Sequence, residues 1–327
     1  MNQDVILTGM RPTGALHIGH YVGVIKNMVA LQKTHPCFFF LADWHALSAL
    51  YDKTDIVRAS RYEYVKGWVA AGVDPKVSPI FKQSDIVETL KLNQFFQCLT
   101  PPGWADRSPS WKDFMNNPNA DRKLDNLGFF TYPILQAADI AIVGGKLVPV
   151  GADQVSHIEI AREIVRKFNR VYKAKLPEPE AYLSEVPKLP GIDGGLKMSS
   201  SIGNTISMNE TEKSLQKKVN KIKTDDTRGD MANPGNPDNC TVCEYHKVFS
   251  PKETCDRVFA ACRSASIGCG ECKLVLGESM KKELLPIADK FNQITDTMCD
   301  EILADGALRA RAVTKKVWAE VEAVTKF

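Results

Sequence analysis

The chain has 327 residues, of which 44% are hydrophobic and 25% charged, with a formal net charge of +3. This composition is typical of a globular protein and excludes a collagen-like, disordered or low-complexity chain. No stretch approaches the ~18 uninterrupted apolar residues of a membrane span, and the first residues lack the basic segment and apolar run of a signal peptide. We therefore expect a soluble, cytoplasmic protein of about two domains, in which the small positive charge neither demonstrates nor opposes a nucleic-acid partner.

The N-terminal half of the chain alternates between short apolar runs and amphipathic stretches. Strands are predicted at residues 5–8, 37–42, 79–81 and 147–150, and helices at 18–31, 56–71, 88–99 and 155–168. Residues 37–42 are apolar on both faces, as expected of a strand buried between two layers. Strands that alternate with helices predict an α/β fold, here a Rossmann-like, doubly wound parallel sheet.

Two segments interrupt this pattern. Residues 101–126 are rich in Pro, Asn and charge and predict a long irregular excursion, and residues 177–201 are rich in Pro and Gly. Beyond Ser207 the strand signals vanish. We predict a Rossmann-like domain over residues 1–188, a mobile loop over 189–207 and a C-terminal, mostly helical domain over 208–327.

Two histidines open the first predicted helix, in the stretch His17-Ile18-Gly19-His20. His17 and His20 lie three residues apart and so share one helical face, at an N-terminus that already favours phosphate. Gly19 has no side chain, so a flat ligand could pack against the backbone there. The alternative is a pair of incidental histidines on a surface turn.

A second element, Lys197-Met198-Ser199-Ser200-Ser201, ends the Pro/Gly-rich segment. A lysine on a flexible loop is a cation suited to polyphosphate, although alone it is more typical of a solvated loop. Because the two elements stand at the two ends of one α/β unit, we expect them to share a nucleoside triphosphate.

The first element resembles the His-Ile-Gly-His signature of class I aminoacyl-tRNA synthetases, and the second resembles their Lys-Met-Ser-Lys-Ser loop. Ser200 departs from that pattern, since the family has a second lysine there. Within the class, nearly the whole chain is similar to tryptophanyl-tRNA synthetases, with supporting stretches at residues 9–14, 43–46, 131–139 and 149–154.

The resemblance implies an ATP- and Mg²⁺-dependent tryptophan–tRNA ligase that forms tryptophanyl-adenylate, transfers the acyl group to tRNA(Trp) and works as a homodimer. It implies His17, His20 and Lys197 as catalytic residues. The implied ATP site comprises Met10, Arg11, Thr13, His17, Gly19, His20, Gly151, Asp153, Lys197, Met198, Ser199 and Ser200. The implied tryptophan site comprises Leu7, Gly9, His45, Tyr132, Gln136, Asp139 and Gln154.

Roles within these sites also follow from the resemblance. Asp139 would accept a hydrogen bond from the indole N–H, an acceptor that a Phe ligand would leave unpaired. Tyr132 and Gln154 would hold the α-ammonium group. Because the second loop lysine is missing, a further cation would come from Arg11, Arg122 or Lys123.

Six of the nine cysteines lie between Cys240 and Cys272. In a reducing cytosol, clustered thiols indicate a metal site, and spacing alone admits zinc bound by Cys240, Cys243, Cys269 and Cys272. A rival set, Cys240, Cys262, Cys269 and Cys272, resembles the tryptophanyl-tRNA synthetases that carry a 4Fe-4S cluster, although those have about one more residue between the first two ligands. We favour the 4Fe-4S cluster over zinc.

The cysteine-rich region is, by resemblance, the one that meets the tRNA anticodon, and the last helix is implied to pack back onto the Rossmann-like domain. Basic residues there could contact tRNA phosphates or form a solvated face: Lys217, Lys218, Lys221, Lys223, Lys247, Lys252, Arg263 and Lys273. Three alternative functions are a tyrosyl-tRNA synthetase, a nucleotidyltransferase with the same His-x-Gly-His element, and a metal-containing RNA-binding paralogue without aminoacylation activity.

Overall fold

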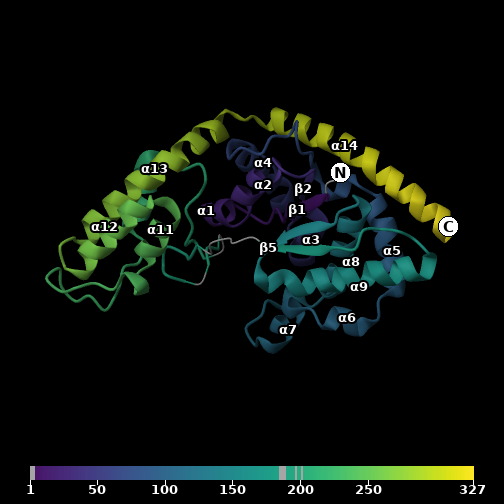
Figure 1. Cartoon of the computed structure of the whole chain (residues 1–327), viewed down its shortest axis with the longest axis horizontal. Coiled ribbons are helices and arrows are strands. Elements are labelled where there is room, and N and C mark those ends of the chain that lie inside the picture. The colour runs from purple at the N-terminus through teal and green to yellow at the C-terminus, as the bar shows by residue number, and fades with distance from the viewer. Residues whose placement is uncertain (1–3, 184–188, 196, 200–201) are drawn as a thin grey trace.

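A five-stranded parallel sheet forms the centre of the N-terminal half of the molecule (Figure 1). The computed structural model describes residues 4–183, 189–195, 197–199 and 202–327. The strands are β1 (Ile6–Met10), β2 (Cys37–Leu41), β3 (Ile80–Lys82), β4 (Leu147–Val150) and β5 (Glu180–Leu183). Their order, β3-β2-β1-β4-β5, confirms the predicted Rossmann-like parallel sheet.

Helices cover both faces of this sheet, and consecutive side chains of a strand point to opposite faces, so each strand contributes to two core clusters. Ile6 and Phe39 pack with helices α1 (Ile18–His20), α2 (Lys26–Leu31) and α4 (Thr54–Ala70). Leu7 and Phe40 pack on the other side with α5 (Glu88–Leu99), α8 (Leu127–Ile142) and α9 (Val155–Tyr172). A single π-helical stretch, Tyr21–Ile25, joins α1 to α2, so residues 18–31 are helical throughout, as predicted.

The prediction of irregular chain over residues 101–126 is wrong. The segment contains helices α6 (Pro102–Asp106) and α7 (Pro109–Asn116) and a 3-10 turn at Arg122–Leu124. Pro102 and Pro109 stand at the first position of their helices, where a missing N–H costs nothing and the fixed φ favours helix formation.

Two further elements carry little signal of their own in the sequence. Helix α3 (Asp43–Leu50) follows β2 directly, and β5 lies inside the predicted loop 177–201. Strand β5 is a half-exposed edge strand. All four of its residues pair in register with β4, and this pairing, rather than an apolar pattern, defines the strand.

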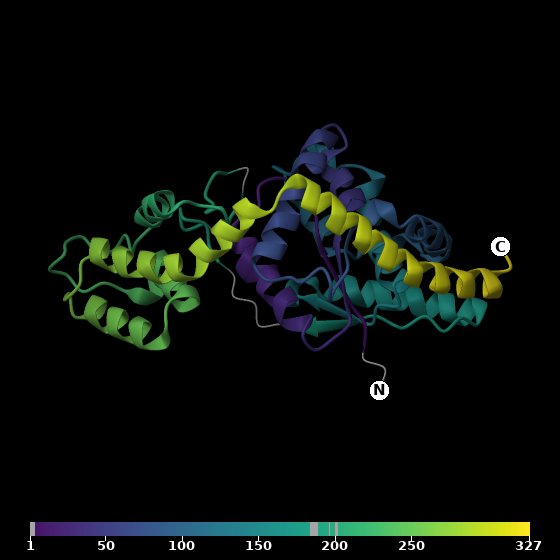
Figure 2. The same ribbon diagram turned by 90° about the horizontal axis from the view of Figure 1, so that it is seen from above.

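The C-terminal region contains α10 (Glu212–Asn220), α11 (Thr241–Phe249), α12 (Lys252–Arg263) and α13 (Cys269–Gln293), and no strand occurs among residues 208–327, all of which are described. Helix α14 (Asp296–Thr325) runs back along the Rossmann-like domain, as the resemblance implied (Figure 2). A Cβ at Gly306 would overlap the Ile80 carbonyl oxygen, so the glycine is what lets α14 lie directly on β3. Within residues 208–327, helices α10–α13 therefore form one part, and α14 packs in the hydrophobic core around the sheet.

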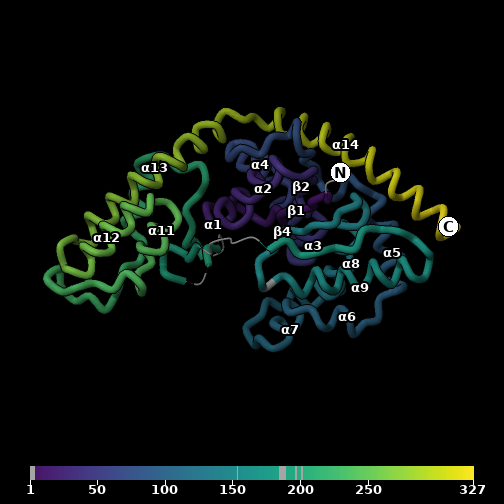
Figure 3. Tube along the Cα trace, in the orientation of Figure 1, coloured from purple at the N-terminus to yellow at the C-terminus, as the bar shows by residue number. Residues whose placement is uncertain are grey.

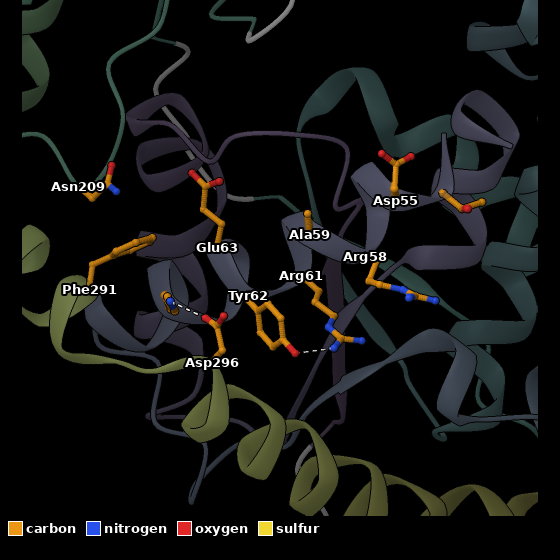
Figure 4. A pocket seen from close by; sticks show the side chains of 11 residues that line it. Asp55, Arg58, Ala59, Arg61, Tyr62, Glu63, Asn209, Phe291 and Asp296 are labelled. Carbon is orange, nitrogen blue, oxygen red and sulfur yellow. Dashed lines mark hydrogen bonds and ion pairs between the residues drawn. The ribbon is translucent and has the colours of Figure 1, made fainter. Parts of the chain in front are cut away.

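The turn between α13 and α14 lies near α4 in the backbone trace (Figure 3). A groove with a volume of about 850 Å³ lies between them (Figure 4). Lys66 of α4 pairs with Asp296 at 2.7 Å, and the Tyr62 hydroxyl donates to Asp300 at 3.0 Å. Another residue of the same helix, Glu63, accepts from the Leu16 N–H at 3.0 Å. Helix α4 thus holds the α13–α14 turn and also the loop that precedes His17.

No helix in the part of the chain that the structure describes combines the length and the apolar character needed to cross a bilayer.

Candidate functional site

His17 and His20 stack on each other at the start of α1, with ring centroids 3.8 Å apart. The His17 backbone N–H donates to His20 Nδ1 at 3.3 Å, so in a neutral ring the His20 proton is on Nε2. His17 Nδ1 is buried without a hydrogen-bond partner among the described residues. A Cβ at Gly19 would lie 2.9 Å from that nitrogen, which explains why a glycine separates the two histidines.

Burial lowers the pKa of His17 to about 4. Burial also lowers the pKa of His20 to about 3, and the neighbouring His17 lowers it further. Both rings are therefore neutral at pH 7, and each can donate one N–H to a phosphate oxygen without placing a charge in the site.

The lysine loop lies against these histidines. Met198 is buried, and its sulfur lies 3.4 Å from the position that a Cβ of Gly19 would take. Just beyond the loop, the Ile206 carbonyl accepts from the Ile18 N–H at 2.9 Å, and His17 forms an antiparallel bridge with Ser207. The structure thus brings the two signature elements together. Lys197 is exposed beside them, and Ser200 lies outside the described residues.

A cavity of about 360 Å³ opens at the carboxyl ends of the strands, where ligands bind in parallel sheets. All seven residues predicted for the tryptophan site line it, together with Arg11 from the predicted ATP site: Leu7, Gly9, Arg11, His45, Tyr132, Gln136, Asp139 and Gln154. Of the other predicted ATP residues, Met10 is buried at the end of β1, Thr13 is exposed, and Gly151 follows β4. The side chain of Asp153 is not among those described.

The floor of the cavity holds a buried carboxylate. Asp139 is 4% exposed, receives His45 Nε2 at 2.8 Å, and receives the Gln83 amide at 2.9 Å on each oxygen. Burial raises the pKa of Asp139, and the hydrogen bond and charge of His45 oppose this rise. One helical turn earlier, Gln136 Oε1 is buried without a partner among the described residues. The floor thus offers acceptors to a ligand that is apolar but carries one donor.

The rim of the cavity carries a second polar cluster. The Tyr132 hydroxyl lies 2.6 Å from His157 Nε2, and His157 Nδ1 lies 2.8 Å from Gln154 Oε1. His157 is not among the residues predicted from the sequence, and neither is Gln83. The spacing Gln154-x-x-His157 at the start of α9 could have indicated His157, whereas Gln83 sits in a short 3-10 turn without a recognisable pattern.

Comparison with known proteins agrees with the resemblance of the sequence to class I aminoacyl-tRNA synthetases. The family described as "tRNA synthetases class I (W and Y)" matches residues 2–284. The tryptophan–tRNA ligase of Thermotoga maritima is 44% identical over 97% of both chains, and that of Ralstonia nicotianae is 36% identical over 98% of both. The chain belongs to the class I tryptophanyl-tRNA synthetases.

Solved structures agree with this membership. The tryptophanyl-tRNA synthetase of Campylobacter jejuni, crystallised with ADP and tryptophan, superposes on the chain with a TM-score of 0.86 at 32% identity, covering 99% of this chain and all of that one. A tyrosyl-tRNA synthetase of Aeropyrum pernix gives a TM-score of 0.69 at 16% identity, which shows the shared fold alone.

The cysteines of this synthetase gather where three helices meet. Cys240 caps the N-terminus of α11, Cys262 lies in the last turn of α12, and Cys269 and Cys272 lie in the first turn of α13. Burial raises the pKa of Cys272 to about 12, and the nearby Cys240, Cys262 and Cys269 raise it further. Among the described residues, no three His, Cys, Asp or Glu side chains are arranged to hold a metal ion. The structure therefore places the four predicted ligands near one another without forming a metal site.

The lowered pKa values of His17 and His20 predict how the two imidazoles titrate in the free enzyme. Their NMR signals, assigned with His17→Asn and His20→Asn variants, should stay constant between about pH 8 and pH 5.5 and move only at lower pH, because each neutral ring resists protonation. A midpoint near the ordinary value of 6.5 for either ring would show that it is solvated instead.

Proposed function

We propose that this synthetase activates L-tryptophan with ATP and transfers the tryptophanyl group to the 3′ end of tRNA(Trp). The observation that carries the proposal is the buried Asp139 carboxylate, held by His45 and Gln83 at the floor of the cavity. The Campylobacter jejuni relative, whose crystals contain ADP and tryptophan, supports the same pair of ligands.

Selection of tryptophan follows from the hydrogen-bonding capacity of the indole ring, which has one donor and no acceptor. Asp139 would take the indole N–H, and Gln136 Oε1 is a second acceptor that lacks a partner among the described residues. A Phe ligand would leave the buried acceptors unpaired at a cost of about 1–3 kcal/mol. Identities of 35–44% to tryptophan–tRNA ligases favour this substrate over tyrosine, the alternative within the same family.

Adenylate formation would be an in-line displacement. A carboxylate oxygen of tryptophan forms a bond to the α-phosphorus of ATP as the bond from that phosphorus to pyrophosphate breaks. The neutral His17 and His20 would donate to the phosphate oxygens, and Lys197 would place a positive charge near the leaving group. When bound with ATP, Mg²⁺ would neutralise part of the phosphate charge.

We further propose that Arg11 supplies the cation that the missing second loop lysine would have given. Arg11 lines the cavity, whereas Lys123 is paired with the Asp52 carboxylate. Arg122, the third candidate, is exposed in the 3-10 turn beside Lys123.

For the cysteine-rich region, we propose a 4Fe-4S cluster held by Cys240, Cys262, Cys269 and Cys272. Cys240 stands at the N-terminus of α11 and Cys269 at that of α13, where the helix dipole favours negative charge. Arg228 adds a positive charge, with Nη1 3.1 Å from the Ile267 carbonyl and 3.9 Å from Cys269 Sγ. A Cβ added at Gly270 would meet no atom of the described residues within 4 Å, so there is open space beside this glycine. The bound cluster would tie together the ends of three helices.

The tRNA would bind the helical region beside this cluster. Several of the basic residues predicted for tRNA already pair with acids, as Lys247 does with Glu244 at 2.6 Å and Arg263 with Asp238 at 3.3 Å. Binding through these groups would exchange such pairs for phosphates, which makes the affinity depend strongly on salt. Because translation is the process that uses aminoacyl-tRNA, we propose a cytoplasmic location.

We propose that two copies of the enzyme associate through the face formed by α3, α5 and α8. A cavity of about 500 Å³ opens between these helices, and the exposed side chain of Tyr51 lines it. Leu127 is exposed at the first position of α8. A second copy would remove this apolar surface from water.

Asp139→Asn should cripple tryptophan activation, because the neutral amide is a weaker acceptor for the indole N–H and can present a donor instead. Amino-acid-dependent pyrophosphate exchange should show a rise in the KM for tryptophan of about 10- to 100-fold, with the KM for ATP little changed. Normal discrimination between tryptophan, tyrosine and phenylalanine by the variant would refute the role of Asp139.

Lys197→Ala should slow adenylate formation in single-turnover experiments by about 100-fold or more, with little change in tryptophan affinity, because the lysine acts on the developing phosphate charge. Arg11→Ala should reduce the same rate, whereas Lys123→Ala is the matched control that removes a cation already paired elsewhere. Unchanged rates for Lys197→Ala would remove the loop from the mechanism, and a loss confined to Lys123→Ala would reverse the choice of Arg11.

Cysteine variants separate the two metal hypotheses. After anaerobic purification, a visible spectrum and metal analysis should show iron and sulfide in the wild type and in Cys243→Ser, and a loss of both in Cys262→Ser. Zinc without iron, retained by Cys262→Ser and lost from Cys243→Ser, would establish the four-thiolate zinc site instead.

Sedimentation equilibrium should show a dimer for the wild type and a shift toward monomer for Leu127→Glu, because a charge on the α3–α5–α8 face opposes burial. A wild-type monomer, or a variant dimer of full strength, would contradict the proposed interface.

A further inference from the structure

His157 is almost completely buried, at 1% exposure, and lies between the two side chains proposed to bind the substrate ammonium group. Its Nε2 is 2.6 Å from the Tyr132 hydroxyl and its Nδ1 is 2.8 Å from Gln154 Oε1. Tyr132 comes from α8, whereas Gln154 immediately precedes α9. The imidazole thus connects the two helices at the rim of the tryptophan cavity.

The proton on this imidazole is fixed by its neighbours. A neutral imidazole has one donor and one acceptor, and a glutamine carbonyl oxygen can only accept, so Nδ1 carries the proton and donates to Gln154 Oε1. Nε2 is then the acceptor. The Tyr132 hydroxyl lies 2.6 Å from Nε2 and 3.1 Å from the Ser110 hydroxyl, so we place its only proton in the shorter bond, to Nε2. The Ser110 hydroxyl then donates to one lone pair of the phenolic oxygen, and the other lone pair is left for a further donor.

We infer that His157 is a positioning residue for the ammonium group of the amino-acid substrate. It holds the Tyr132 hydroxyl with its proton turned away from the cavity, and it holds Gln154 with its carbonyl oxygen at a fixed place on the rim. Both oxygens are thereby preset as acceptors, which is what an ammonium group with three N–H donors requires. This inference rests on the proposed binding of the ammonium group by Tyr132 and Gln154, and it adds the residue that orients them.

The His157 imidazole also contacts the segment that contains α6 and α7. Ser108, fully buried between α6 and α7, places its hydroxyl 3.2 Å from His157 Nε2. The Ser110 hydroxyl of α7 lies 3.1 Å from that of Tyr132. Residues 102–116 are therefore anchored to the ammonium end of the cavity by two serines, which gives this excursion a place in the amino-acid site.

The test compares two ligands that differ only at the ammonium group. L-Tryptophan and indole-3-propionate share the indole ring and the carboxylate, and only tryptophan carries the ammonium. Binding of both to the full chain is measured by calorimetry, with KM and kcat for tryptophan from pyrophosphate exchange. In His157→Phe, which keeps the ring packing against Tyr132, tryptophan affinity should fall by about 10- to 100-fold while indole-3-propionate affinity stays within about twofold. The KM should rise in parallel, with kcat nearly unchanged.

Two conservative variants divide the effect. His157→Asn can replace the Nδ1 donor to Gln154, and His157→Gln can replace the Nε2 acceptor for Tyr132, so each should recover part of the preference for tryptophan. These variants also carry the test if His157→Phe does not fold. An equal loss of affinity for both ligands would show a merely structural role, and full retention of the tryptophan preference would show no role; either result overturns the inference.

Tyr132→Phe separates this inference from the proposal beneath it. If Tyr132→Phe loses the preference for tryptophan and the His157 variants keep it, the ammonium site is correct and the inference about His157 is wrong. If Tyr132→Phe keeps the full preference, the ammonium group binds elsewhere, and the inference fails together with that assignment.

Discussion

A backbone hydrogen bond from the Ile18 N–H to the Ile206 carbonyl, 2.9 Å long, joins the histidine turn at the N-terminal end of the chain to the segment that carries Lys197. If His17, His20 and Lys197 act together on one ATP, they depend on this hydrogen bond, because it holds their two segments side by side. The bridge between His17 and Ser207 and the packing of Met198 near Gly19 extend it. A side chain at position 19 would displace the His17 ring, so the glycine is a condition for the whole arrangement.

The two ends of the site use different electrostatics. The histidines are buried and neutral, so they add donors without charge, whereas Lys197 and Arg11 are exposed cations. At the amino-acid end, Asp139 is buried and held by His45 and Gln83, so its oxygens have fixed positions. The phosphate end thus keeps its charges in water, and the amino-acid end keeps its polar groups fixed.

The C-terminal half of the chain supports both ends from outside. Helix α14 lies on the sheet through Gly306, and the turn before it pairs with α4 through Lys66 and Asp296. Helix α4 also accepts a hydrogen bond from the Leu16 N–H through Glu63. The same helix therefore contacts both the α13–α14 turn and the residue that precedes His17.

The sequence by itself determined the parts that depend on local pattern. Alternating strands and helices predicted the parallel sheet. The motif around Asp139 lies at the cavity beside the carboxyl ends of the strands, and the segments around His17 and Lys197 lie against each other. Helices α6 and α7 were missed because prolines that start a helix look like prolines that break one. Only the tertiary structure decided the contacts that have no local pattern: Gln83 beneath Asp139, His157 between Tyr132 and Gln154, and α14 on β3. Each of these depends on the packing of segments that lie far apart in the chain, and it is the burial and orientation produced by that packing which turn an ordinary Gln or His into part of a binding site.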